Sequence, residues 1–245
     1  MIADVWTVMW KEWKDIFLQR GSLRGGAWNL LLMIGVFGVF LPLQTGRAWV
    51  ESPLGLIYWA WVPLFLVTTV IADSFAGERE RHTLETLLAS RLSDRAILLG
   101  KVGAAVGYGW GLTMVAMLVG LVTVNLAHGQ GKLLLYPAAV FVGIVALSLL
   151  AAGLVAGAGV LISLRAATVR QAAQTMSIAI MLLLFVPMFG AQALPAEWKM
   201  RLARVIMVAD VTQIVLVAAA ALIVLDIGLL VAAMARFQRA RLILD

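Results

Sequence analysis

Six stretches of the chain are apolar and almost free of acidic and basic residues. They lie between Arg24 and Arg47, Glu51 and Asp73, Lys101 and Lys132, Lys132 and Arg165, Arg170 and Glu197, and over 211–235, where Asp226 is the single charged residue. Each is long enough to cross a bilayer, since a helix needs about 20 apolar residues to span the hydrocarbon core. The pattern therefore predicts an all-α, polytopic membrane protein with six transmembrane helices.

An amphipathic helix is predicted over 2–20, before the first of these stretches. At 100° per residue its apolar side chains share one face: Ile2, Val5, Trp6, Met9, Trp13, Ile16 and Phe17. Asp4, Lys11, Lys14 and Asp15 fall on the opposite face. Tryptophan and lysine on opposite faces are typical of a helix in the membrane interface, so we expect Trp6, Trp10, Lys11, Trp13 and Lys14 to hold it there. The alternative is that the helix packs on the protein's own spans.

Three further elements complete the predicted organisation. A short amphipathic helix over about 195–209 precedes the last span on the outer side, and Ser93 is the expected N-cap of the third span. Glycines recur every fourth residue in the third and fourth spans, which favours close packing of helices, either within one chain or between two copies: Gly103, Gly107 and Gly111, and Gly153 and Gly157. The whole chain forms one transmembrane domain, with 1–24 as the interfacial helix, 25–235 as the six-span bundle and 236–245 as a cytoplasmic tail.

Composition and charge agree with this class and give the bundle an orientation. Hydrophobic residues make up 63% and charged residues 13% of the 245 positions, whereas a soluble domain is about a quarter charged. With six spans, 14 of the 19 Lys and Arg residues fall on the side of the termini and 5 on the other. Basic residues concentrate in cytoplasmic loops, so we expect a multi-pass plasma-membrane protein with both termini in the cytoplasm. The net charge of +6 is then explained without a nucleic-acid partner.

The chain carries no pattern that indicates an enzyme. It has no cysteine, its two histidines are far apart, and neither Gly100-Lys101 nor Gly131-Lys132 continues as a phosphate-binding loop. We expect no catalytic residue, metal or cofactor in this chain. Residues that could line a transport pathway are polar and lie within or near the spans: Asp226, Asn125, Gln174 and Ser177. For Asp226 the alternative is a structural role, as an acceptor of hydrogen bonds from neighbouring helices.

The loop between the second and third spans is the segment richest in charge. It reads DSFAGERERHTLETLLASRLSDRAILLGK over 73–101. On one helix, Glu78, Arg81 and Glu85 would stand on neighbouring turns and pair, while Leu84, Leu87 and Leu88 would form a stripe. Such a helix at the cytoplasmic surface suits docking to a soluble protein; the alternative is a solvated connector.

This loop resembles the signature of the permease subunits of type-2 ABC transporters, a family of ABC exporters. The resemblance rests on Glu78-Arg79-Glu80, Thr83-Leu84-Glu85, Leu87-Leu88, Ser93 and Gly100-Lys101. The opening KEWKDIFLQR over 11–20 is similar to the family's N-terminal interfacial helix, and the order of spans fits the whole chain. Two positions depart from the family pattern: His82 stands where glycine is usual, and Arg91 where proline is common.

The resemblance implies a permease subunit that forms the transmembrane pathway for ATP-driven export. ATP and Mg²⁺ would bind to separate ABC ATPase subunits, and this chain would pair with a second permease copy or a paralogue and contact membrane lipid. A coupling helix over 78–88 would dock on the ATPase through Glu78, Arg79, Glu80, Arg81, Thr83, Glu85, Leu87 and Leu88. Two other classes of protein are also all-helical and apolar. A membrane anchor or assembly subunit of a respiratory or redox complex should carry haem-ligand histidines in its spans, and a lipid-modifying enzyme should carry a polar cluster at one membrane face.

Overall fold

The computed structural model describes residues 1–19, 26–201 and 210–237, and in these ranges it contains helices and no strand. Among the described residues, five helices are long and apolar enough to cross a membrane: α5 (Gly55–Glu80), α7 (Asp94–His128), α8 (Ala138–Ser163), α9 (Val169–Ala193) and α11 (Val211–Arg236). They coincide with the last five predicted spans. The all-helical, multi-pass class of the prediction is therefore confirmed.

The first predicted span is a helical run of three pieces, α2 (Gly26–Met33), the π-helix η1 (Ile34–Phe40) and α3 (Leu41–Thr45). Its apolar part, Leu30–Thr45, is shorter than the other spans. The irregular turn has a local cause, because Pro42 has no N–H to donate to the carbonyl of Gly38. The Thr123 hydroxyl of α7 donates to this carbonyl instead (2.8 Å).

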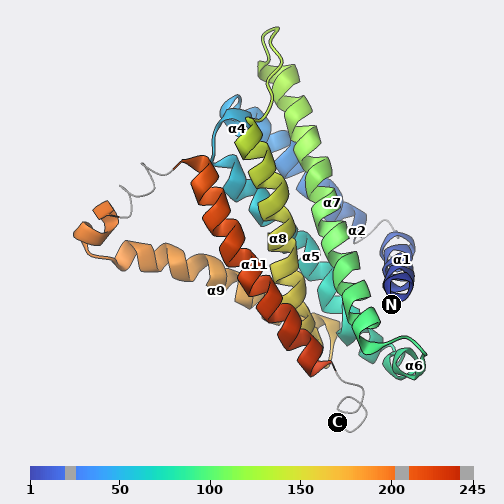
Figure 1. Cartoon of the computed structure of the whole chain (residues 1–245). Coiled ribbons are helices and arrows are strands. Elements are labelled where there is room, and N and C mark those ends of the chain that lie inside the picture. The colour runs from blue at the N-terminus through green and yellow to red at the C-terminus, as the bar shows by residue number, and fades with distance from the viewer. Residues whose placement is uncertain (20–25, 202–209, 238–245) are drawn as a thin grey trace.

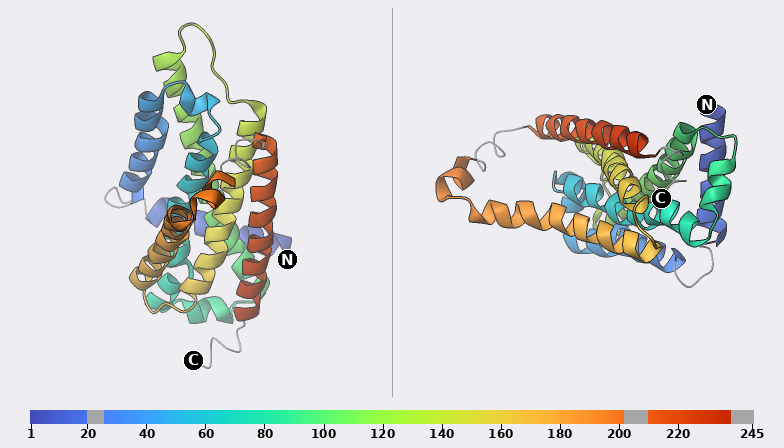
Figure 2. Two further views of the ribbon diagram at one scale, coloured as in Figure 1. Left: turned by 90° about the vertical axis from the view of Figure 1, so that its left-hand side faces the viewer. Right: turned by 90° about the horizontal axis from the view of Figure 1, so that it is seen from below.

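Helix α5 is the centre of the bundle and is buried along most of its length. It packs against α7, α8 and α9, while α11 covers α8 and α1 (Ile2–Gln19) lies along α7 (Figures 1 and 2). One apolar core, around Phe75 and Ile97, lies at the end of the bundle where α6 (Leu84–Ala89) is found, which we call the α6 end. A second core, around Trp49 and Trp59, fills the opposite end.

Helices α9 and α11 expose largely apolar surfaces on the outside of the bundle. Helix α9 has only three buried residues, Ala172, Met176 and Ile180, all in its first half, and its second half diverges from the other helices (Figures 1 and 2). Most of α11 is also exposed, with bulky apolar side chains such as Leu216 and Val224 on its surface. Such surfaces fit a hydrocarbon environment and a neighbouring helix equally well.

The side chain of Ser163 in α8 forms hydrogen bonds with the backbone of α5. Its hydroxyl donates to the Ala72 carbonyl (3.0 Å) and accepts from the N–H groups of Phe75 (3.1 Å) and Ala76 (3.0 Å). The side chain is fully buried. In a regular α-helix the N–H of Ala76 would donate to the Ala72 carbonyl, and here the Ser163 hydroxyl bonds to both groups. Ser163 therefore links α8 to α5 where α5 approaches the α6 end.

We expect Ser163→Ala to lower the free energy of unfolding by about 1–3 kcal/mol, because buried backbone groups lose a hydrogen-bond partner. Ser148→Ala is the matched control on the same helix: Ser148 is equally buried, but its hydroxyl bonds only to Val145 of its own helix (3.2 Å). Thermal melting of the purified variants measures the difference. Equal melting temperatures for the two variants would contradict a bridging role for Ser163.

The small-residue positions pack within the chain. A Cβ atom on Gly103 or Gly107 would lie 3.0 Å from the Met9 side chain or 2.9 Å from Trp13, and one on Gly157 would lie 3.0 Å from Leu229. Gly111 has open space beside it. Of the two alternatives left by the sequence, packing within one chain accounts for most of the repeat.

The short helix predicted over 195–209 is described only in part. Residues 196–201 are helical, and 202–209 lie outside the described residues. Of the predicted tail over 236–245, only Arg236, which ends α11, and Phe237 are described.

Candidate functional site: an ion-pair cluster beside helix α6

One face of α1 packs closely on the first half of α7. Val8 is buried, and a Cβ atom on Gly100 would lie 3.1 Å from the Val5 carbonyl, so glycine is needed there for the two helices to approach. The Trp13 indole donates to the Ala104 carbonyl of α7 (3.0 Å). One face of α1 therefore packs on the protein's own spans, which was the alternative to placement in the membrane interface.

A second apolar face of α1 stays uncovered. Ile2, Trp6 and Trp10 are exposed, Phe17 is 60% exposed, and Lys14 lies over the Trp10 ring at 5.6 Å. Of the five side chains expected to hold α1 in the membrane interface, Trp6, Trp10 and Lys14 lie on this face. Trp13 instead packs on α7, and Lys11 pairs with Glu78 of α5. Placement of α1 in the interface remains a prediction.

Lys101 of α7 is the centre of a cluster of ion pairs. Its Nζ lies 2.8 Å from Glu12 of α1, 3.3 Å from Glu78 of α5 and 2.8 Å from the Ser74 carbonyl. The side chain is almost completely buried. An ammonium group has three N–H donors, and all three find an acceptor here. Lys101 therefore joins three helices at one point.

Lys11 closes the same cluster from the solvent side. Its Nζ lies 3.1 Å from Glu78 and 3.5 Å from both Glu12 and Asp15. Partial burial alone lowers the pKa of Lys11, but the carboxylates of Glu12, Glu78 and Asp15 outweigh this effect, so its pKa is raised above the ordinary value. Lys11 therefore stays charged. The two lysines balance the two carboxylates of Glu12 and Glu78, and we call these four residues (Lys11, Glu12, Glu78 and Lys101) the ion-pair cluster.

Glu78 also connects the cluster to the chain leading into α6. Its second carboxylate oxygen accepts from the Thr83 hydroxyl, and its carbonyl accepts from the Thr83 N–H (2.9 Å). The His82 N–H bonds to the Arg79 carbonyl (3.1 Å), and His82 has a positive φ of 57°. This pair of bonds is the Schellman motif that ends many helices.

The prediction of one coupling helix over 78–88 is therefore wrong. Helix α5 ends at Glu80, the chain reverses at His82, and the separate helix α6 begins at Leu84. Glu78 lies on α5 and Glu85 lies on α6. The two carboxylates therefore cannot pair with Arg81 on successive turns of a single helix. Arg81 instead pairs with Asp73 (3.2 Å).

The left-handed backbone conformation at position 82 explains why glycine is usual there in the family that the loop resembles. A left-handed backbone conformation costs an ordinary residue about 1–2 kcal/mol, and glycine adopts it freely. We expect His82→Gly to raise the free energy of unfolding by about 0.5–1 kcal/mol, after the larger entropy loss of glycine on folding. His82→Ala keeps the Cβ atom and should give no gain. A melting temperature of the glycine variant at or below that of the alanine variant would contradict the motif.

Arg79 and Glu80 brace the connection between α8 and α9. The Arg79 guanidinium donates to the carbonyls of Ala166 (2.5 Å) and Leu164 (2.9 Å), just beyond the end of α8. Glu80 accepts from the N–H of Val169 (3.1 Å) in the first turn of α9, where a negative charge is favourable. The charges of the predicted coupling motif thus mostly hold the bundle together.

Only part of the surface of helix α6 is exposed. Leu84 is buried and Leu87 is half-buried against the core of the α6 end, whereas Glu85 and Thr86 are exposed. The side chain of Leu88 lies outside the described residues. The helix is thus anchored by leucine and presents polar groups outward.

An open pocket of about 610 Å³ lies among α1, α5 and α7 around this cluster, lined by residues that include Lys11, Asp15, Glu78 and Lys101. Its charged groups are already paired with one another. In the described part of the chain, no three His, Cys, Asp or Glu side chains gather as a metal site would require.

The four residues proposed for the pathway lie on three different helices, α7, α9 and α11. Asn125 holds the loop after α7 through two hydrogen bonds to the Leu134 backbone (2.8 and 2.9 Å). Gln174 and Ser177 are exposed on α9. Asp226 of α11 faces Gly153 of α8, where a Cβ atom would lie 2.8 Å from a carboxylate oxygen, and its other oxygen is buried without a hydrogen bond to any described residue. The absence of a side chain at Gly153 is what admits the carboxylate.

Comparison with known families identifies the class of protein. The family described as ABC-2 family transporter protein matches residues 63–204, more than half of the chain. The chain therefore belongs to this family of transmembrane transport components, whose members typically work with an ABC ATPase. The matched part contains α6 and Lys101, while α1 and α11 lie outside it. No match was found among curated proteins.

Sequence reasoning missed Glu12, Ser74 and Ser163. In the sequence, Lys101 stands out as the boundary of the third apolar stretch and as part of a Gly-Lys signature, and neither feature identifies its partners. A lysine at the start of a long apolar stretch nevertheless signals a charge that must find a partner. Glu12 could have been found by the same argument, since it falls between the charged and apolar faces of α1.

Proposed function

We propose that this chain is the permease subunit of an ATP-driven exporter, energised by a separate ATPase subunit that docks on α6. Membership of the ABC-2 transporter family supports a transport subunit. The observation that carries the proposal further is the position of α6: a short helix with an exposed polar surface, fixed by buried leucine and by the Thr83–Glu78 contact to the ends of the spans.

The ion-pair cluster gives this docking a mechanical consequence. A force on α6 acts through Thr83 on Glu78 and from there on Lys101 and Lys11. Closure of two ATPase subunits would then move the ends of α1, α5 and α7 together as one body. In this mechanism the chain undergoes conformational change and carries out no covalent chemistry.

We further propose that 26–45 is a sixth crossing and that the α6 end faces the cytoplasm. Arg47 bonds to Gln130 (2.8 Å) at the end of the bundle away from α6, whereas α1 lies at the α6 end. The 20 helical residues over 26–45 rise about 30 Å, which is long enough to connect these two ends. Phe237 packs on Phe75 with ring centroids 5.0 Å apart, so α11 ends at the α6 end too. An even number of crossings fits the Lys and Arg count.

A purification from native membranes tests the function. The tagged chain, extracted in a mild detergent, should bring with it an ATPase subunit that contains an intact phosphate-binding loop and, in a complete transporter, a second permease copy or paralogue. ATP hydrolysis should reside in that subunit and be absent from the chain alone. Isolation of the chain with haem or redox subunits, or with no ATPase, would overturn the proposal.

A further inference from the structure

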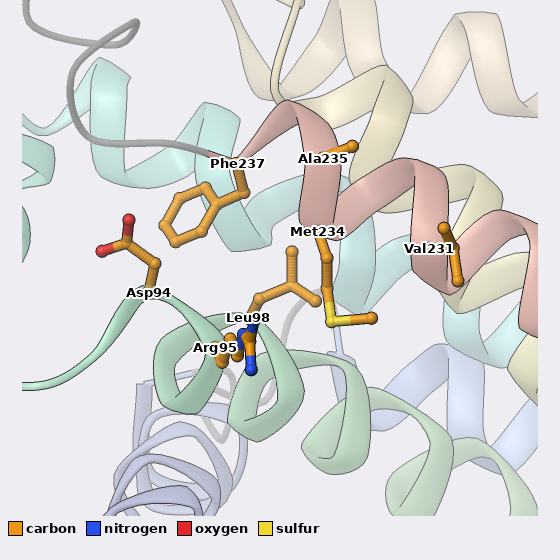
Figure 3. A pocket seen from close by; sticks show the side chains of 7 residues that line it. All are labelled: Asp94, Arg95, Leu98, Val231, Met234, Ala235 and Phe237. Carbon is orange, nitrogen blue, oxygen red and sulfur yellow. The ribbon is translucent and has the colours of Figure 1, made fainter.

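The two ends of the bundle are packed differently. At the α6 end a pocket of about 550 Å³ opens between α7 and α11, and Leu98, Met234 and Phe237 are among the residues that line it (Figure 3). At the opposite end, which we call the closed end, Trp49 is 2% and Trp59 0% exposed. Polar groups buried at the closed end need hydrogen-bond partners inside the bundle.

Three buried polar atoms lie together at the closed end. They are Nε1 of Trp49 on α4 (Ala48–Glu51), Nε1 of Trp59 on α5, and the hydroxyl oxygen of Tyr136, which is 9% exposed and precedes α8. The two indole rings meet edge to face, with centroids 5.6 Å apart. Burial raises the pKa of Tyr136 to about 12, and both indole N–H groups are near enough to its hydroxyl to lower this pKa by a smaller amount. Yet none of the three atoms completes a hydrogen bond to a described residue.

A backbone carbonyl beside Trp49 lacks its helical donor. In η1 the Leu41 N–H donates to the carbonyl five residues before it, and Pro42 has no N–H. The Phe37 carbonyl therefore receives neither the bond that an α-helix would supply from Leu41 nor the one that a π-helix would supply from Pro42. Gly120 of α7 faces both groups, since a Cβ atom there would lie 3.0 Å from Trp49 Nε1 and 3.5 Å from the Phe37 carbonyl oxygen.

We propose that one buried water molecule binds among Trp49, Trp59 and Tyr136. These side chains offer three donors, two N–H and one O–H, but a single acceptor, the Tyr136 oxygen. A water molecule adds two lone pairs, so that every donor finds an acceptor, and one of its protons reaches the Phe37 carbonyl. A buried water in proteins typically makes about three such bonds. The site connects η1, α4, α5 and the chain leading into α8.

The surroundings select a neutral ligand. The core around the site is apolar, with side chains such as Val62, Met117 and Ile144, and an ion placed there would lose its hydration without a counter-charge. An anion would also meet the Phe37 carbonyl oxygen, and a cation would meet the indole N–H groups, whereas water both accepts and donates. Ordered water commonly satisfies backbone groups that proline frees in a membrane helix. This inference concerns the closed end and does not depend on ATPase docking at α6.

Radiolytic labelling of the purified full-length chain detects the water directly. Hydroxyl radicals that an X-ray pulse generates from a bound water oxidise the side chains beside it, even where bulk solvent has no access. Relative to intrinsic reactivity, Trp59 should be labelled several-fold more than Phe75, which is also 0% exposed but lies in the other core. Labelling of Trp59 should fall in the Tyr136→Phe variant, because the water loses one of its partners.

The melting temperature of Tyr136→Phe supplies a test whose sign is decisive. With the water bound, this variant should melt about 2–4 °C below the wild type, the shift expected for one lost hydrogen bond in a chain of this size. Without the water the hydroxyl is a buried group that lacks a partner, so its removal should raise the melting temperature. Tyr58→Phe is the matched control: its ring stacks on Trp49 at 5.3 Å but is 40% exposed, and it should melt as the wild type does.

Three results would overturn the proposal. A melting temperature of Tyr136→Phe at or above that of the wild type would show that the hydroxyl has no bound partner. Equal labelling of Trp59 and Phe75 would show that no water lies beside the indole. A melting temperature that falls when gluconate replaces chloride, in the wild type but not in Tyr136→Phe, would assign the site to an anion instead.

Discussion

Lys101→Met should destabilise the protein by about 3–5 kcal/mol, the largest effect that we expect from a single substitution. Removing one partner of a buried ion pair leaves its carboxylates without compensation. Glu12 and Glu78 would both lose their closest buried cation, and the Ser74 carbonyl would lose a donor. The Lys101 Nζ lies 5.4 Å from the centre of the Phe75 ring. Methionine has a similar length and no charge, so the packing of this side chain on Phe75 is largely kept. The melting temperature and the yield of monodisperse protein measure the loss.

Lys11→Met is the matched control for this experiment. It removes a cation from the same Glu78 carboxylate, at 3.1 Å, but from a half-exposed position. Exposed ion pairs contribute only about 0–1 kcal/mol, so this variant should melt close to the wild type. If both variants melt alike, burial of Lys101 does not decide the stability of the cluster.

Glu85→Arg should separate the chain from its ATPase without unfolding it. Glu85 is exposed on α6 and reverses sign in this variant, and like charges brought together at an interface cost several kcal/mol. We expect ATPase recovered with the chain, and its stimulated hydrolysis, to fall on the order of tenfold or more. Glu51→Arg makes the same change at an exposed position of α4 (Ala48–Glu51), at the opposite end of the bundle, and should have no effect.

The choice of Glu85 follows from the position of Glu78. The sequence pattern treats the two as equivalent docking residues, but Glu78 is buried and paired with two lysines. A Glu78 substitution would therefore damage the fold and could not isolate docking. Unchanged ATPase recovery with Glu85→Arg would show that α6 is not the docking surface.

Much of the fold follows from local sequence rules. Long apolar stretches and their flanking charges predicted the places of five spans, and each coincides with a long apolar helix of the structure. The helix ends were less well predicted, since α5 continues to Glu80 and α7 begins at Asp94, outside the charge-free stretches. Ser93 is the N-cap of α7, as predicted, and accepts from the N–H of Ala96 (3.3 Å). These features depend on residues near one another in the chain, which is why periodicity and capping rules could find them.

The site could be predicted only in part, because its contacts join distant segments. The charged run from Glu78 to Arg81 reads as one exposed helix face, yet tertiary partners bind nearly all of it: Glu78 meets Lys101, and Arg79 meets Ala166. The helix break at His82 was hidden for another reason. Histidine carries no signal for a left-handed turn as strong as that of glycine.

A crosslink from α6 to an ATPase subunit tests the central claim most directly. A photoreactive residue placed at Glu85 in the native membrane should form a covalent adduct with a subunit that contains a phosphate-binding loop. The same residue at Glu51, at the opposite end of the bundle, should form none. Equal adducts from both positions, or an ATPase adduct from Glu51 alone, would contradict the account.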